Sequence, residues 1–166
     1  MTANAALSFD FAAGAAFSAS RAHVWLRCVG SESLIRDNRT SFSSTPEALS
    51  SGVLLHSICA KLLLGKDAML SSAENSLYLS EVEDNQSLVS FYVDCVKRLI
   101  PDNKHRLFVE HDFSLTNDGI DFKCIADCVI VDEKNNILTV VDLKTGYIAV
   151  SAEDNEQLIL YAHAAA

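Results

Sequence analysis

The chain has 166 residues, of which 49% are hydrophobic and 21% are charged, and its net charge is −9. This length and composition are typical of one globular domain with a core of its own. The acidic balance excludes a protein that coats nucleic acid through bulk positive charge. It does not exclude a nuclease, because a bound metal ion offsets acidic ligands. No apolar run is long enough to span a bilayer, so we expect no membrane partner.

The beginning of the chain does not read as a secretory signal, because residues 1–17 lack an early basic residue. We expect a cytoplasmic protein with a mobile N-terminal segment over residues 1–17 and a single domain over residues 18–166. The cysteines number five and are widely spaced, at Cys28, Cys59, Cys95, Cys124 and Cys128. Without a C-x-x-C pair they do not indicate a zinc ribbon, and we expect buried free thiols in a reducing compartment.

Apolar residues recur at helical spacing in four stretches, which predict helices over residues 18–29, 45–64, 84–100 and 151–163. Thr45 and Pro46 are typical of a helix start, and Gly65 is typical of a helix end. Gly52 lies inside the second helix, where glycine costs about 1 kcal/mol relative to alanine. We therefore expect another element to pack close to the backbone at Gly52.

The period of the apolar residues changes from 3.6 to 2 after residue 105, which predicts strands over residues 106–115, 122–131 and 137–144. Short polar turns join these strands, so they form an antiparallel meander. The element order is three helices, three strands and a final helix. This order predicts a fold of the α/β (α+β) class.

Asp142, Leu143 and Lys144 end the third predicted strand. Residues two apart on a strand share a face, so Asp142 and Lys144 lie side by side while Leu143 points into the core. A carboxylate beside an ammonium group is either an ordinary surface pair or half of a metal-dependent hydrolytic site. The triplet alone is common and does not decide between these interpretations.

Asp127 lies in the middle of the apolar second strand. A charge in such a strand is costly unless it is paired or binds a metal ion. Asp127 is therefore a residue at a strand edge, a partner of Lys144, or a metal ligand. Beside Asp142 on the neighbouring strand it would complete a pair of carboxylates suited to Mg²⁺.

Four further polar residues have both an ordinary and a functional interpretation. His56 lies one turn after Gly52, where a histidine is more often solvated than a ligand. Gln157 and Tyr161 are four apart on the last helix and share a face, so they are either ordinary helix residues or groups that hold a phosphate backbone or orient a metal site. Glu110 lies in the first strand and is either a further member of the acidic cluster or a surface residue, and the loose pattern of this strand favours the surface role.

In chain order, Gly52-x-x-x-His56, Asp127, Asp142-Leu143-Lys144 and Gln157-x-x-x-Tyr161-Ala162 resemble the RecB-like branch of the PD-(D/E)XK nuclease superfamily. The segment Ser18-x-Ser20-Arg21-Ala22-His23-x-Trp25-Leu26-x-Cys28-x-Gly30-Ser31 further resembles the opening of phage-encoded members. The similarity extends over about residues 18–164. It implies a restriction-endonuclease-like core.

The resemblance also implies a function, namely a Mg²⁺- or Mn²⁺-dependent DNA nuclease, and most simply an exonuclease of phage-type recombination, replication or repair. Asp127 and Asp142 would bind the metal with the help of the Leu143 carbonyl, and His56 would be a further ligand.

The remaining residues of the motif would serve the substrate. Lys144 would position the attacking water and offset the charge at the scissile phosphate. Gln157 and Tyr161 would steady the site and the DNA strand.

Two features depart from the family. Some relatives hold an iron–sulfur cluster through one early and three late cysteines, and Cys28 has no such late counterparts, so we expect no cluster. The strand that would follow the final helix is also not found. We expect a truncated chain, or a sheet completed by a protein partner or by self-association. The alternatives are a catalytically impaired nuclease-fold binding or regulatory module that acts through a protein partner, and a structural domain with an Asp–Lys surface pair.

Overall fold

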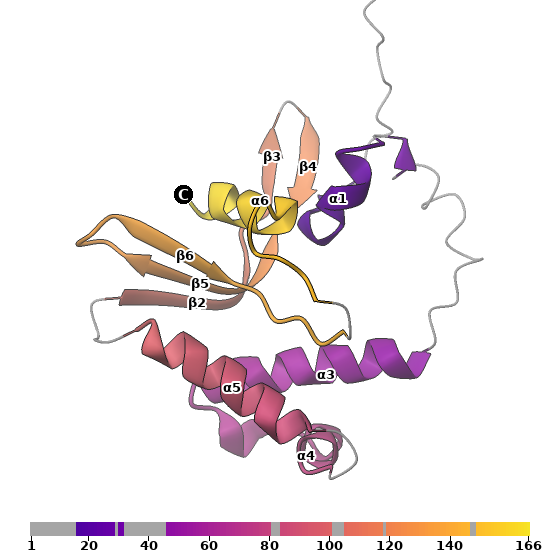
Figure 1. The fold of residues 1–166 in the computed structure, drawn as a ribbon, viewed down its shortest axis with the longest axis vertical. Helices are drawn as coiled ribbons and strands as arrows, with labels where there is room; N and C mark the ends of the chain where they lie inside the picture. Colours follow the sequence, from indigo (N-terminus) through magenta and orange to yellow (C-terminus); the bar gives the residue numbers. More distant parts are fainter. Residues whose placement is uncertain are drawn as a thin grey trace, which may run out of the picture.

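The computed structural model describes residues 16–28, 30–31, 46–80, 84–100, 105–117, 119–146 and 149–166. Helices and two small three-stranded sheets give the chain a mixed α/β fold, as predicted (Figure 1). Residues 1–15 of the predicted mobile segment lie outside the described residues. Among the described helices, none combines the length and the apolar character needed to cross a membrane.

The two long helices form where the sequence predicts them, as α3 (Pro46–Leu63) and α5 (Asn85–Arg98). Thr45, the predicted N-cap of α3, lies outside the described residues. Gly65 has a φ of 65° just after α3, a conformation in which glycine pays no Cβ penalty. The predicted stop at Gly65 is therefore confirmed.

Between these helices the chain forms η2 (Asp67–Met69) and α4 (Ser72–Tyr78). A capping box starts α4: Ser71 Oγ accepts from the Glu74 N–H, and Glu74 Oε2 accepts from the Ser71 N–H. The buried Glu74 carboxylate also accepts from Lys61 Nζ at 2.7 Å and from Ser57 Oγ. Glu74 thus ties α4 to α3, and the Lys61 ammonium above all lowers the pKa of this carboxyl to about 2.

The central sheet has the strands β2 (His105–Asp112), β5 (Ile125–Asp132) and β6 (Ile137–Val141) in the order β2-β5-β6, all antiparallel. The predicted meander is confirmed. The first two predicted strands are each interrupted, because the chain bends at Phe113 and Cys124 and continues as β3 (Leu115–Asn117) and β4 (Ile120–Lys123). The Phe113 N–H donates to the Cys124 carbonyl at 2.9 Å, which holds the two bends together.

The N-terminal elements differ from the prediction. The chain forms β1 (Ala16–Ser18), η1 (Ala19–Arg21) and α1 (Ala22–Trp25), so the helix predicted over residues 18–29 is wrong beyond one turn. β1 pairs in parallel with β4, which makes the second sheet β1-β4-β3. Tertiary contacts of Trp25 override the helical pattern: its Nε1 donates to the Ser18 carbonyl at 2.8 Å, and its ring packs edge-on against Phe17.

Helices cover both faces of the central sheet, with α3 and α5 on one side and α6 (Glu156–Ala165) on the other (Figure 1). Cys128 and Ile130 pack with α3 and α5, whereas Val129 packs with Tyr161 of α6. This alternation is the period of a strand buried on both faces. Buried thiols were predicted, and Cys59, Cys124 and Cys128 are buried while Cys28 is exposed.

The last helix starts later than predicted. Its N-cap is Asn155, whose side-chain oxygen accepts from the N–H groups of Gln157 and Leu158. Ser151 instead accepts from the Glu153 N–H in the preceding turn. Asp154 between them has a φ of 54°, which no helix tolerates, so the chain turns there before α6 begins.

Candidate functional site

All seven predicted site residues line one cavity of about 520 Å³ where α3, β5, the segment after β6 and α6 meet; they are His56, Asp127, Asp142, Leu143, Lys144, Gln157 and Tyr161. Ser18, Ser20 and Lys123 line the same cavity. The tight approach of α3 to the segment after β6 closes one side: a Cβ on Gly52 would lie 3.2 Å from Thr145 Oγ1. This confirms the predicted close packing at Gly52.

Asp127 is nearly buried and fully engaged in this cavity. Its Oδ1 lies 3.1 Å from His56 Nδ1, and its Oδ2 accepts from the Leu143 N–H at 2.6 Å. The charge in the apolar strand is therefore compensated from α3 and from the backbone after β6. Among the described residues Lys144 is not a partner of Asp127, because its ammonium pairs with Asp142 instead.

Glu110 is a residue that sequence reasoning ranked below the others. Its Oε1 lies 3.6 Å from His56 Nδ1, and one ligand atom each of His56, Glu110 and Asp127 lie within 4.8 Å of one another. Its side chain is 39% exposed, so Glu110 lies at the surface and also joins the acidic residues around His56. The three residues, here called the acidic–histidine cluster, come from α3, β2 and β5.

The backbone at Glu110 explains how the strand delivers its side chain. The pairs Val109–Cys128 and His111–Ala126 flank a position where Glu110 faces Asp127 without a ladder pair. Glu110 has a φ of 47°, in the left-handed region that non-glycine residues rarely adopt. Such strain costs about 1–3 kcal/mol and gathers at functional sites. Periodicity carries no signal for one strained residue.

The irregular backbone at Glu110 of β2 is matched by an irregularity in the neighbouring strand β5. Ala126 and Val129 belong to one core cluster, although residues three apart on a regular strand face opposite sides. The side-chain alternation therefore breaks between them, next to Asp127. This break allows Asp127 to reach His56 on α3 while Val129 packs toward α6.

The charge state of His56 follows from its two carboxylate neighbours. The hydrogen bond with Asp127, and then that with Glu110, raises the pKa of His56 from 6.5 to about 10, against the opposing effect of burial. At neutral pH the imidazolium is the cation that balances the two acids. Two carboxylates facing each other across a strand pair would otherwise repel.

Asp142 and Lys144 form a second network beside the acidic–histidine cluster. Lys144 Nζ lies 2.6 Å from Asp142 Oδ2 and donates to Gln157 Oε1 at 2.7 Å. Gln157 Nε2 donates to Asp142 Oδ1 at 3.0 Å and lies 3.0 Å from the Tyr161 hydroxyl. The predicted shared face of Gln157 and Tyr161 is confirmed, and it holds the Asp142 carboxylate in place.

Asp142 is not a surface residue. Its side chain is 6% exposed, and burial is the main reason why the pKa of this carboxyl is raised, although Lys144 opposes the shift. Oδ2 lies 2.6 Å from the Lys144 ammonium. A cation that enters the cavity would therefore compete with Lys144 for this oxygen.

The group of possible metal ligands that the structure brings together is not the same as the predicted ligand set, which stays a prediction. The prediction groups His56, Asp127, Asp142 and the Leu143 carbonyl, whereas the described structure brings His56 and Asp127 together with Glu110. Asp142 is held outside that cluster by Lys144 and Gln157. Leu143 supplies its N–H to Asp127, and a role for its carbonyl stays a prediction.

Comparison with known proteins places the chain in a family. A model of the family described as "Protein of unknown function (DUF2800)" matches residues 14–166. The chain belongs to this DUF2800 family. No curated protein and no solved structure matches it. In this DUF2800 chain, the chemistry therefore has to be inferred from the site itself.

The donor atoms of the site suit a divalent cation. The acidic–histidine cluster offers one imidazole nitrogen and two carboxylates, and Asp142 contributes a further buried carboxylate to the cavity that His56 and Asp127 line. Carboxylate oxygens suit Mg²⁺ and Mn²⁺, and an imidazole donor favours the softer ion of the two. Metal binding would require His56 to release its proton, since only the neutral imidazole is a ligand.

Proposed function

We propose that this chain is a divalent-metal-dependent DNA nuclease with a restriction-endonuclease-like core, as the resemblance to RecB-like PD-(D/E)XK enzymes implies. One observation carries the proposal: His56 and Asp127 of the acidic–histidine cluster line a single cavity with the Asp142–Lys144 pair, although these residues lie far apart in the sequence, and Glu110 lies against His56. A cavity that combines metal-binding carboxylates with a lysine contains the groups that phosphodiester hydrolysis requires.

In this proposal His56, Glu110 and Asp127 hold a Mn²⁺ or Mg²⁺ ion, with Asp142 beside it. When bound, the ion supplies Lewis acidity and a water molecule of lowered pKa. The Leu143 N–H holds Asp127 in position through its bond to Oδ2. This bond and the contact of Asp127 Oδ1 with His56 orient Asp127 and His56 before any ion binds, which reduces the cost of ordering these two ligands.

Lys144 is the group that acts on the substrate. Its side chain is 42% exposed, so the ammonium can reach a phosphate in the cavity while Asp142 and Gln157 hold it. A fixed positive charge there offsets the negative charge that develops on the phosphate oxygens. Tyr161 supports the network through Gln157, and burial raises the pKa of its hydroxyl to about 12, so it stays neutral.

The proposal is tested by cleavage of linear DNA in Mn²⁺ or Mg²⁺. Lys144→Ala and Asp127→Asn are expected to lower the rate by at least about a hundredfold, because each removes a group that acts in the transition state. Lys134→Ala and Asp94→Asn change exposed residues far from the cavity and are the matched controls. Cleavage that is unchanged in both site variants contradicts the mechanism.

Two observations favour the second candidate, a catalytically impaired nuclease-fold module that binds a protein partner. The site charges are already paired within the chain, His56 with two carboxylates and Lys144 with Asp142. In addition, β6 pairs only with β5 among the described strands, so its other edge is available to a partner strand or a second copy. Calorimetric titration with Mn²⁺ separates the candidates, since this module would give no heat of binding.

A further inference from the structure

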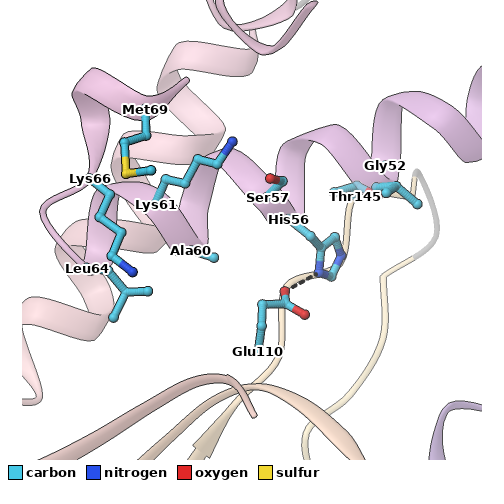
Figure 2. A pocket seen from close by; sticks show the side chains of 11 residues that line it. Gly52, His56, Ser57, Ala60, Lys61, Leu64, Lys66, Met69, Glu110 and Thr145 are labelled. Carbon is cyan, nitrogen blue, oxygen red and sulfur yellow. Dashed lines mark ion pairs between the residues drawn. The ribbon is translucent and has the colours of Figure 1, made fainter. Parts of the chain in front are cut away.

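A second cavity, of about 830 Å³, runs along α3 beside the acidic–histidine cluster (Figure 2). We call it the α3 groove. Its lining from α3 and the residue that follows this helix recurs every three to four residues, as one face of a helix does, and comprises Gly52, Val53, His56, Ser57, Ala60, Lys61 and Leu64. In Figure 2 Met69, Lys66 and Leu64 lie at one end, Gly52 and Thr145 at the other, and His56 with Glu110 between them.

The α3 groove is mainly apolar, and little of its apolar surface is covered. The side chains of Val53, Leu64 and Met69 line it although all three are exposed to solvent. Its two lysines differ: Lys61 is bound to the buried Glu74 carboxylate, whereas Lys66 has no ion-pair partner among the described residues. The groove therefore offers apolar surface and one available positive charge next to the proposed metal site.

This combination does not suit a DNA duplex. Duplex binding relies on many lysine and arginine contacts to phosphates, and the chain as a whole carries a net charge of −9. An unpaired strand, in contrast, exposes its base faces, so side-chain contacts with the bases add to the contacts with phosphates. The flexible Met69 side chain adapts to bases of any sequence.

We propose that the α3 groove binds the unpaired end of a DNA strand and leads it to the acidic–histidine cluster. This inference rests on the proposed nuclease function and adds its substrate class. The nine residues from His56 to Leu64, eight steps of about 1.5 Å, span about 12 Å along α3 and its end. At the 3.4 Å spacing of stacked nucleotides, that length holds about three or four nucleotides on one side of the scissile phosphate.

The experiment measures binding and cleavage separately. A fluorescein-labelled single-stranded oligonucleotide and a blunt duplex of the same sequence are titrated with protein in Ca²⁺, with fluorescence anisotropy as readout, and then assayed for cleavage in Mn²⁺. The groove variants are Met69→Ser and Lys66→Gln, alone and combined. The controls are Phe91→Ser, which changes an equally exposed apolar residue of α5, and Lys134→Gln, which changes an exposed lysine.

The single strand is expected to bind at least tenfold more tightly than the duplex. The combined groove variant is expected to weaken single-strand binding about tenfold, and the controls are expected to leave it unchanged. Equal affinity for duplex and single strand, or an unchanged affinity in the combined variant, overturns the inference. So does a groove covered by a second copy, in which case Met69→Ser alters the sedimentation coefficient and not the oligonucleotide affinity.

The two proposals fail in different ways. If the wild-type protein binds the single strand through Met69 and Lys66 but cleaves no DNA with either metal, the nuclease function is refuted and the groove assignment stands. If it cleaves duplex and single strand equally and the groove variants have no effect, the groove assignment is refuted and the nuclease function stands. Lys144→Ala, which lies outside the α3 groove, should abolish cleavage and weaken single-strand binding less than the combined groove variant does.

Discussion

Glu110 gives the sharpest test of the site, because its backbone strain and its proposed metal role respond to different substitutions. It has a φ of 47° within β2 and contributes a carboxylate to the acidic–histidine cluster. Glu110→Gly removes both the carboxylate and the strain. Glu110→Ala removes the carboxylate and keeps the strain, so it is the matched control.

The expected difference in stability between these variants follows from the backbone. In an ordinary strand, glycine is less stable than alanine by about 0.5–1 kcal/mol. In the left-handed region, a Cβ costs about 1–2 kcal/mol, which glycine avoids. Both variants lose the same contact with His56, so the difference isolates the backbone. Glu110→Gly should therefore be more stable than Glu110→Ala by about 1 kcal/mol, or about 2–4 °C in Tm.

The assay combines urea unfolding with calorimetric titration of Mn²⁺. Both variants should bind Mn²⁺ at least about tenfold more weakly than the wild-type chain, since each lacks one carboxylate ligand. A glycine variant less stable than the alanine variant would refute the left-handed conformation at Glu110. Unchanged Mn²⁺ affinity in both variants would refute its role as a ligand.

Three further predictions concern pH and packing. Mn²⁺ competes with the proton on His56, whose pKa is raised to about 10. Calorimetry between pH 6.5 and 8 should therefore show the affinity for Mn²⁺ rising about tenfold per pH unit. A flat profile would exclude His56 as a ligand. Glu74 has a pKa lowered to about 2, so it contributes stability above pH 4.5 that is lost as the pH falls toward 2. Urea unfolding at pH 6 should therefore show Glu74→Gln to be less stable than the wild type by about 2–3 kcal/mol, a gap that closes by pH 2, with Glu153→Gln as control. Gly52→Val should lower the free energy of unfolding by about 1–3 kcal/mol, because the new side chain would press against Thr145. Thr145→Ala should restore part of this loss in the double variant. If the effects of the two substitutions on the free energy of unfolding simply add, the two residues do not touch.

The sequence predicts the elements whose apolar residues keep one period over many positions. α3, α5 and the meander β2-β5-β6 lie where the pattern places them, because burial on one or two faces imposes that period. The pattern fails at the N-terminal segment, where Trp25 packs on Phe17 and the chain extends into β1. A parallel partner more than a hundred residues away, β4, leaves no local signal.

The site shows the same division. Motif order brings His56, Asp127, Asp142 and Lys144 forward as candidates, and the structure places them in one cavity. Motif order does not divide these residues into the acidic–histidine cluster and the Asp142–Lys144 network. That division depends on side-chain directions at the end of β6, where Lys144 turns to Asp142 and the Leu143 N–H turns to Asp127.

The sequence by itself determines the types of groups that this chain contributes, an imidazole, several carboxylates and a lysine on elements of predictable type, because side-chain chemistry and periodicity are local properties. The tertiary structure alone decides which of those groups meet. Glu110 joins His56 and Asp127 because one residue of β2 adopts a left-handed conformation opposite Asp127. The α3 groove exists because η2 places Met69 and Lys66 beside one face of α3. Both depend on contacts between segments far apart in the chain, and such contacts have no period to detect.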